Sequence, residues 1–255
     1  MAKIGFFIQS SYQELFVNNT NVLKEHYHKI IDENNYDIEL YSFVGNLEIE
    51  DTYEEGDVIY CKDSDRYPNK KYSTLFKYIQ ENKKYDYVLI TNNTTLTNIH
   101  YLWNAIDSID KSCYYCTLVI NNFMNYPNGN VKLMSWEVFN KIADIYDTAY
   151  YTILPIYDFV FGRWTTLYTL ENFSSWVGAT EDMIIGACLY RLRIPYVKIN
   201  EYCTIYEYLD APQKDVIDWD KTLFLTTKIT ATYEERLVRE TEELKAIIEK
   251  VTARE

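Results

Sequence analysis

Three segments of the sequence bring together side chains that could bind or activate a ligand. The first is Tyr85–Asn98, where an apolar run ends in Asn92, Asn93 and Thr94. These side chains donate and accept hydrogen bonds without carrying charge, and a strand end is where nucleotide-binding α/β sheets contact their ligands. The cluster also suits a simple turn with Thr97 as the N-cap of a following helix, and the residues alone favour that simpler interpretation.

The second segment, Asn125–Ser135, contains Pro127 and the pair Asn128 and Gly129. These residues are typical of a tight turn that leads into a strand, with Ser135 as the N-cap of the next helix. Gly129 would let the backbone approach a ligand closely, because glycine has no side chain. A turn without any ligand explains the segment equally well.

The third segment, Trp176–Gly186, leads through small residues to Glu181 and Asp182 at the start of a predicted helix. The helix dipole stabilises a carboxylate in this position, so we expect Asp182 to stay ionised. An ionised carboxylate at the mouth of a cleft is suited to act as a general base. Acidic residues in a first turn are also ordinary helix capping, and both interpretations stay open.

Alternating strands and helices have to position these segments. Short apolar runs predict strands at Ile4–Ile8, Ile38–Val44, Val58–Cys61, Tyr87–Thr91, Cys116–Ile120 and Val131–Met134. Apolar residues at helical spacing predict helices at Asn21–Asp32, Ser73–Glu81, Thr97–Ile109, Trp136–Ile145 and Asp182–Leu192. The alternation predicts an α/β fold with a mixed, mostly parallel central sheet flanked by helices, and ligand contacts at the carboxyl ends of its strands.

The segment Tyr233–Val251 predicts a long amphipathic helix with an almost wholly charged polar face. We expect this helix to pack across the domain, and the alternative is a helix that pairs with a second copy of the chain in a homo-oligomer. No Gly/Ser/Pro-rich stretch divides the sequence. We therefore assign residues 1–210 to one domain and residues 211–255 to a C-terminal helical extension.

Charge and hydropathy exclude some classes of partner. The net charge is -13, and the densest cationic spots are short pairs such as Lys70–Lys71. A nucleic-acid polymer is therefore not expected, because its phosphates are neutralised by clustered Lys and Arg. No window reaches about 18 uninterrupted apolar residues, and the early run Ile4–Ile8 is too short for a signal peptide. These patterns predict a cytoplasmic protein without a membrane span.

The cysteines favour reduced thiols over a disulfide framework, because five is an odd number in a large chain. Cys113 and Cys116 have CxxC spacing but no second pair. They precede a predicted strand, on which residues three apart point to opposite faces. We therefore expect strand packing here and not a metal or redox site.

Together the segments resemble glycosyltransferase family 31, the inverting β-1,3-galactosyltransferase and Fringe-like group with a GT-A fold. Thr91–Asn98 is similar to the family's aspartate run, TDDDxFVN, and Glu181–Ile194 is similar to its EDVxxGxCLxxLGI segment. Tyr126–Ser135 resembles YPxYxxGxGYxLS, and Glu55–Ile59 followed by Asp65–Thr74 resembles the GD-I-I and DxYxNLTxKT segments. The resemblance covers roughly residues 38 to 197.

The resemblance implies an enzyme that moves a hexose, with galactose or glucose favoured, from a UDP-sugar to a hydroxyl of a glycan or glycoconjugate acceptor. Asp182 would take the proton of that hydroxyl, whose oxygen attacks the anomeric carbon from the face opposite the departing nucleoside diphosphate. The implied donor-binding residues are Ser10, Ser11, Lys70, Lys71, Asn92, Asn93 and Thr94. The implied acceptor-binding residues are Gly129, Trp176 and Glu181.

The chain departs from the family where a divalent ion is expected. Asn92, Asn93 and Thr94 stand in place of aspartates, and no histidine follows His100, although the family tends to offer a late one. Mn²⁺ or Mg²⁺, the ions expected from the family, would be held weakly by these neutral side chains. Either the chain is a metal-independent transferase, which the retained acid Asp182 favours, or it is an inactive module that binds sugar or nucleotide or serves assembly. The cations that could replace a metal are Lys70, Lys71, Lys132 and Arg163.

Overall fold

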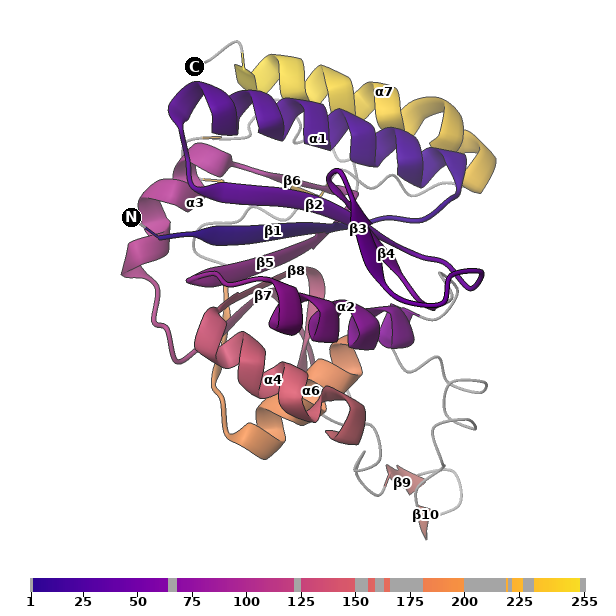
Figure 1. Ribbon diagram of the computed structural model, residues 1–255, viewed down its shortest axis with the longest axis vertical. Helices are drawn as coiled ribbons and strands as arrows, with labels where there is room; N and C mark the ends of the chain where they lie inside the picture. Colours follow the sequence, from indigo (N-terminus) through magenta and orange to yellow (C-terminus); the bar gives the residue numbers. More distant parts are fainter. Residues whose placement is uncertain are drawn as a thin grey trace.

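The structure is a computed structural model that describes residues 2–63, 68–121, 125–149, 156–158, 163–165, 181–199, 219, 222–226 and 232–252. A central β-sheet lies between two layers of helices (Figure 1). Within the described residues this sheet has eight strands in the order β11-β7-β8-β5-β1-β2-β4-β3. Their bounds are Ile4–Gln9 (β1), Ile38–Gly45 (β2), Tyr53–Glu55 (β3), Val58–Cys61 (β4), Tyr87–Asn92 (β5), Tyr114–Asn121 (β7), Asn125–Ser135 (β8) and Tyr196–Lys198 (β11).

Most strands of this sheet run in one direction. β1 is parallel to β2 and β5, β2 is parallel to β4, and β7 is parallel to β11. β8 is antiparallel to β5 and β7, and β3 is antiparallel to β4. The mixed, mostly parallel sheet predicted from the sequence is confirmed. Two antiparallel pairs lie outside it: β6 (Thr95–Thr97) with β12 (Phe224–Thr226), and β9 (Ile156–Asp158) with β10 (Arg163–Thr165).

Helices cover both faces of the sheet (Figure 1). One layer contains α1 (Glu14–Asn34), α3 (Ile99–Ala105) with the 3-10 turn Ile106–Ser108, and α7 (Tyr233–Thr252). The other layer contains α2 (Pro68–Asn82), α4 (Trp136–Ala149) and α6 (Glu181–Leu192). α7 lies along α1, so the end of the described chain packs against its beginning.

Side chains that alternate along β1 give each face of the sheet its own core. Phe6 packs on the side of α1, where its ring centroid is 5.2 Å from that of Tyr27. Phe7 packs on the opposite side, against Tyr41 at 5.6 Å and Tyr85 at 6.0 Å. A Cβ at Gly5 would lie 2.6 Å from the Tyr85 ring, so this strand position has no room for a side chain. Packing on both faces fixes the strands and therefore the edge formed by their carboxyl ends, where open α/β sheets generally bind ligands.

The N-cap predicted for α4 is confirmed, whereas the one predicted for α3 is wrong. Ser135 Oγ accepts a hydrogen bond from the main-chain N–H of Val138 at 3.3 Å, which caps α4. Thr97 belongs to β6, and Asn98 caps α3 by accepting a hydrogen bond from the N–H of Tyr101 at 2.9 Å. Both amides and hydroxyls cap helices well, so sequence alone does not decide between these neighbours.

The tight turn predicted at Pro127–Gly129 is also wrong. β8 continues through these residues, and its pairing with β7 shifts register between Cys116 and Leu118. A local irregularity in the ladder therefore accommodates residues whose types usually mark a turn.

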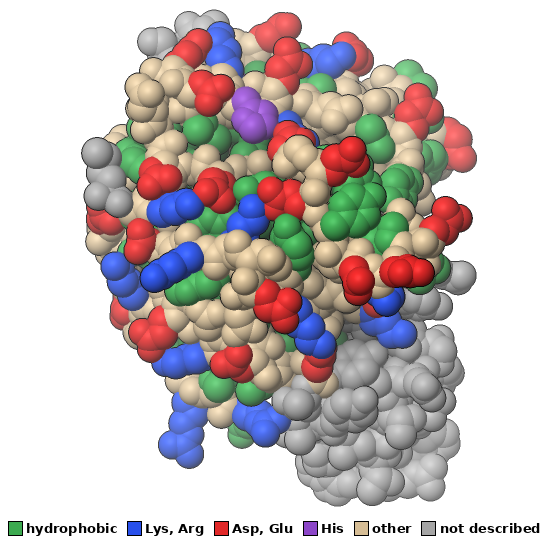
Figure 2. Space-filling view, viewed as in Figure 1, with side chains coloured by type: hydrophobic (Ala, Val, Ile, Leu, Met, Phe, Trp, Pro, Cys, Tyr) green, Lys and Arg blue, Asp and Glu red, His purple; other side chains and the backbone are tan. Residues whose placement is uncertain are grey.

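The surface shown in Figure 2 carries charges of both signs, as the many Asp, Glu, Lys and Arg residues of the sequence lead us to expect. Figure 2 shows Asp and Glu side chains interspersed with Lys and Arg on the face that it presents. In the described part of the chain, no helix has the length and apolar character needed to cross a membrane. The cysteines that the structure describes, Cys61, Cys113, Cys116 and Cys188, are buried free thiols.

Candidate ligand-binding pocket

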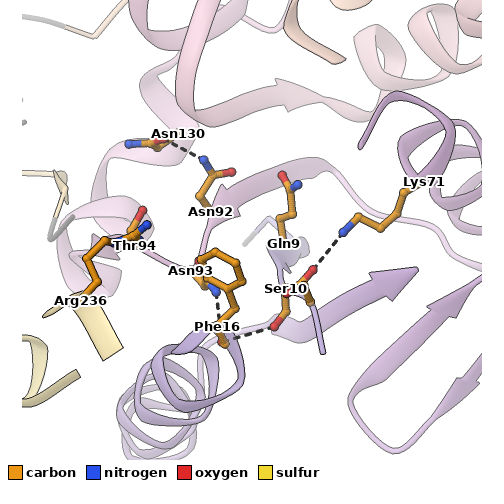
Figure 3. A pocket seen from close by; sticks show the side chains of 10 residues that line it. Gln9, Ser10, Phe16, Lys71, Asn92, Asn93, Thr94, Asn130 and Arg236 are labelled. Atoms are coloured by element: carbon orange, nitrogen blue, oxygen red, sulfur yellow. Dashed lines mark hydrogen bonds between the residues drawn. The ribbon is translucent and has the colours of Figure 1, made fainter. Parts of the chain in front are cut away.

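A pocket of about 250 Å³ opens where β1 and β5 end (Figure 3). Because these strands are parallel neighbours, their carboxyl ends meet at one edge of the sheet. The described residues that line the pocket are Gln9, Ser10, Ser11, Phe16, Lys71, Asn92, Asn93, Thr94, Asn130 and Arg236. They offer amides, hydroxyls and two cationic groups, and none of these ten is acidic.

The end of β1 is held by α2. Lys71 is buried, and its Nζ donates to the main-chain oxygen of Ser10 at 2.9 Å. The hydroxyl of Tyr72 donates to Gln9 Oε1 at 3.1 Å. Thr20 on α1 donates to Ser10 Oγ at 2.8 Å from the other side. The first lining residues are therefore fixed from both helical layers.

The end of β5 carries the amide cluster. Asn92 Nδ2 donates to Asn130 Oδ1 on β8 at 2.8 Å, which joins two neighbouring strands at the pocket. Asn93 and Thr94 form the turn between β5 and β6. Asn93 Nδ2 donates to the main-chain oxygen of Phe16 at 3.0 Å (Figure 3). The cluster therefore connects the sheet to the start of α1.

Tyr27 of α1 fixes the strand that follows this turn. Its buried hydroxyl donates to the main-chain oxygen of Thr95 at 3.2 Å and accepts from the N–H of Thr97 at 2.8 Å. Burial raises the pKa of Tyr27 more than the hydrogen bond from Thr97 lowers it, so the phenol stays protonated as the donor that Thr95 needs. β6 is thus positioned by a side chain as well as by its pairing with β12.

α7 contributes a cation from the far end of the chain. Arg236 donates from Nε and Nη2 to the two carboxylate oxygens of Glu240 at 2.7 Å and 2.9 Å. Glu240 is fully buried and accepts from Asn19 Nδ2 on α1 at 2.9 Å, while Thr241 donates to Asn19 Oδ1 at 2.7 Å. This polar network attaches α7 to α1 and places Arg236 in the pocket wall.

Asp182 forms a buried ion pair beside the pocket. Lys132 Nζ lies 2.9 Å from Asp182 Oδ1 and 3.6 Å from Glu181 Oε1. Burial alone lowers the pKa of Lys132, but the negative charges, above all that of Asp182, raise it well above its ordinary value. Lys132 is therefore a charged partner for the two acids at the start of α6.

Two connections link this ion pair to the pocket. The ammonium of Lys132 lies 5.3 Å from the ring centroid of Tyr72, whose hydroxyl donates to the lining residue Gln9. Lys132 also follows the lining residue Asn130 by two positions on β8. A chain of contacts through Lys132 and Tyr72 therefore leads from the acids of α6 to the pocket, although neither acid is among its described lining residues.

The structure brings together most of the predicted donor-binding residues. Those that line the pocket are Ser10, Ser11, Lys71, Asn92, Asn93 and Thr94. Lys70 is exposed on α2 and is not among the described lining residues. Of the predicted acceptor-binding residues, Glu181 accompanies Asp182 at Lys132, Gly129 lies in β8, and Trp176 falls outside the described residues.

Four lining residues were not predicted: Gln9, Phe16, Asn130 and Arg236. Gln9 and Asn130 directly flank predicted strands, so a rule that includes the residues at strand ends would have found them. Arg236 had no distinguishing signal, because it is one charge among many on an amphipathic helix.

The described lining does not fit a divalent cation. Mg²⁺ and Mn²⁺ prefer carboxylate oxygens, whereas Asn92, Asn93 and Thr94 offer amide and hydroxyl oxygens. The nearby cations Lys71 and Arg236 would repel a metal ion. Within the described residues, no group of three or more His, Cys, Asp or Glu side chains is arranged to hold one.

Known proteins are similar to this chain in structure but not in sequence. No family model matches the sequence, and no curated protein is similar enough in sequence to count as a relative. The galactosyltransferase LgtC, solved with donor and acceptor sugar analogues, superposes with a TM-score of 0.53 at 8% identity, over 96% of this chain and 95% of LgtC.

Two further structures are more distant. A glycosyltransferase involved in the glycosylation of the major capsid of PBCV-1 gives a TM-score of 0.48 at 14% identity, over 96% of this chain and 99% of that one. The 2-C-methyl-D-erythritol 4-phosphate cytidylyltransferase of Francisella tularensis gives 0.40 at 13% identity, over 77% and 89%. The superposition on LgtC and the sheet described above show that this chain has a GT-A-like fold.

Proposed function

We propose that this chain is a glycosyltransferase that binds a UDP-sugar in the pocket at the ends of β1 and β5. The donor we infer carries a hexose, galactose or glucose, which is transferred with inversion to a hydroxyl of a glycan. The proposal places the chain in glycosyltransferase family 31 as a member that lacks the acidic run.

The observation that carries the proposal is the convergence of separate segments on one pocket. It is lined by Ser10 and Ser11, which follow β1, by Asn92 at the end of β5 with Asn93 and Thr94 of the β5–β6 turn, and by Lys71 of α2. This sheet edge is where α/β folds bind nucleotides, and hydroxyls and amides suit the hydroxyls of ribose and sugar. The volume of about 250 Å³ is slightly below the roughly 300–1,000 Å³ typical of small-molecule sites, which suits part of a nucleotide sugar.

The proposed reaction forms a bond from the acceptor oxygen to the anomeric carbon as the bond from that carbon to the UDP oxygen breaks. The acceptor proton passes to a carboxylate, for which we propose Asp182, and the negative charge leaves with UDP. Lys132 holds the Asp182 carboxylate at 2.9 Å and so competes with the acceptor proton for it. Lys132 therefore opposes the protonation of Asp182 that the proposed step requires.

That ion pair also favours a second candidate function, namely donor binding without turnover. An aspartate that is 7% exposed and paired with a buried ammonium has a structural reason to be present. In this candidate the chain binds a sugar or nucleotide as a module of a larger assembly.

A thermal-shift screen of UDP-galactose, UDP-glucose and free UDP, with and without manganese and a chelator, tests the proposal. Binding to the folded state raises Tm by mass action, so we expect stabilisation by a UDP-sugar that persists in the chelator. A transfer or donor-hydrolysis assay with the same sugars then separates the two candidates. Stabilisation without turnover supports the binding module, and no stabilisation by any nucleotide sugar contradicts both.

A further inference from the structure

The first turn of α7 is fixed by its own cap. Thr232 donates from its N–H to Glu235 Oε2 at 2.9 Å, and Glu235 donates from its N–H to Thr232 Oγ1 at 3.3 Å. This reciprocal capping box makes Thr232 the N-cap, so the helix begins at Tyr233. Arg236 follows directly, so its backbone position is set by the cap and by the packing of α7 on α1 (Figure 1).

The Arg236 side chain is also held in one orientation. The bidentate bond to Glu240 occupies two of the five N–H donors of the guanidinium. Its Cζ lies 5.8 Å from the ring centroid of Phe16, another lining residue. Because Glu240 is fully buried and bound to Asn19, the carboxylate cannot swing away with the arginine. The guanidinium is therefore oriented before any ligand arrives, which lowers the entropic cost of binding.

The charges around the pocket select the kind of ligand group. Figure 3 shows Arg236 and Lys71 on opposite sides of the pocket, with the Asn92–Thr94 cluster nearer to Arg236. No acid is among the described lining residues, although the whole chain carries a net charge of -13. A pocket wall with two cationic side chains and no acid is suited to a compact polyanion. Although Glu240 balances its charge from behind the wall, the planar guanidinium of Arg236 keeps further N–H donors, and these fit phosphate oxygens better than a neutral sugar.

We propose that Arg236 binds the diphosphate of the donor and supplies the positive charge that the neutral Asn92–Thr94 segment does not recruit through a metal. This inference rests on the proposed function, since it concerns the same pocket. It assigns to the C-terminal helix a direct contact with the ligand, in addition to its packing role. Glu240 acts as a positioning residue, because it orients Arg236 without reaching the pocket lining itself.

Two binding measurements in the presence of EDTA test the inference. Calorimetric titration gives the affinities for UDP and inorganic pyrophosphate, and ligand-observed NMR gives the affinity for uridine. We expect Arg236→Gln to weaken the binding of UDP and pyrophosphate at least tenfold and to leave uridine binding unchanged. The matched control is Arg239→Gln, which removes the same charge from the same helix but breaks a more exposed pair with Glu243. The control should bind all three ligands as the wild type does.

Arg236→Gln leaves the buried Glu240 carboxylate without its guanidinium, which could destabilise the fold. The double variant Arg236→Gln/Glu240→Gln removes that buried charge while keeping an amide oxygen for Asn19, and it should show the same selective loss. Wild-type affinity for UDP in either variant overturns the role of Arg236 and leaves the proposed function standing. A wild-type protein that binds none of the three ligands overturns the proposed function and this inference with it.

Discussion

Lys132 and Asp182 form a buried ion pair that joins β8 to α6, with 2.9 Å between Nζ and Oδ1. Breaking such a pair leaves a charge in the protein interior without its counter-ion, which typically costs about 3–5 kcal/mol. Because Glu181 is a second, weaker partner at 3.6 Å, we expect Asp182→Asn to lower the free energy of unfolding by about 3 kcal/mol. Urea denaturation measures this loss, and unchanged stability would show that the pair is not structural.

Replacing both Lys132 and Asp182 by apolar residues should cost less stability than removing the charge of one of them. Lys132→Met/Asp182→Leu removes both charges of the pair but leaves the buried Glu181 without its cation, so we expect it to lose about 1–2 kcal/mol of stability, less than Asp182→Asn loses. If this double variant binds UDP but transfers no sugar, the carboxylate is needed for catalysis beyond its structural role. Loss of UDP binding in a stable double variant would instead show that the ion pair shapes the pocket.

Asn92, the last residue of β5, and Asn93, in the turn that follows, should differ in their tolerance of a carboxylate. Asn93 donates to the main-chain oxygen of Phe16, which cannot donate in return, so Asn93→Asp places two acceptors together. We expect that variant to lose about 2 kcal/mol of stability. Asn92 faces the amide of Asn130, which can rotate to donate to an aspartate, so Asn92→Asp should lose less than about 1 kcal/mol. Thermal denaturation of the two variants measures both losses, and equal losses would contradict the assigned contacts.

His26 should make stability depend on pH. Burial is the main cause that lowers the pKa of His26 from 6.5 to about 4, and the charges of Lys29 and His100 add to it. Between these two pH values the unfolded chain binds a proton that the folded chain does not, so the free energy of unfolding falls as pH drops from about 6.5 to about 4.

We expect the wild type to lose about 2 kcal/mol more than His26→Gln between pH 7 and pH 4.5. Urea denaturation at the two pH values measures this difference. Acids with lowered pKa values, such as Asp57, stabilise the fold less at low pH, but they do so in both proteins, so their contribution cancels in the comparison. Parallel pH profiles for the two proteins would contradict the prediction.

The attachment of α7 to α1 should depend on one amide. Asn19 donates to Glu240 and accepts from Thr241, so Asn19→Ala removes two buried hydrogen bonds at once. We expect a loss of about 2–3 kcal/mol, against less than about 0.5 kcal/mol for its half-buried neighbour in Asn18→Ala. Hydrogen exchange should show faster opening of α7 in the first variant alone, and equal exchange in both would contradict the role of Asn19.

Apolar patterns predicted where the elements lie but not where they begin. The helix expected from Asn21 starts at Glu14, because its first turns bury the polar residues Asn19 and Thr20. Asn19 bonds to Glu240 on α7, and Thr20 bonds to Ser10. These partners lie outside the helix, so the helical spacing of apolar residues gives no sign of them. Buried polar contacts of this kind are invisible to a pattern that counts only apolar side chains.

The site was predictable to the extent that it follows strand ends. Ser10 and Asn92–Thr94 come directly at or after predicted strands, and the structure brings them to one pocket. Asp182 was singled out for its place at a helix start, but its partner Lys132 lies fifty positions earlier in a strand. Sequence indicated the acid, and only the fold shows which cation faces it.

The pocket is assembled from both ends of the described chain, since Gln9 and Arg236 belong to the same lining. During synthesis the first strands are therefore made long before the helix that completes this wall. A nascent chain that has folded its sheet still lacks Arg236, so this pocket wall is complete only after α7 has left the ribosome.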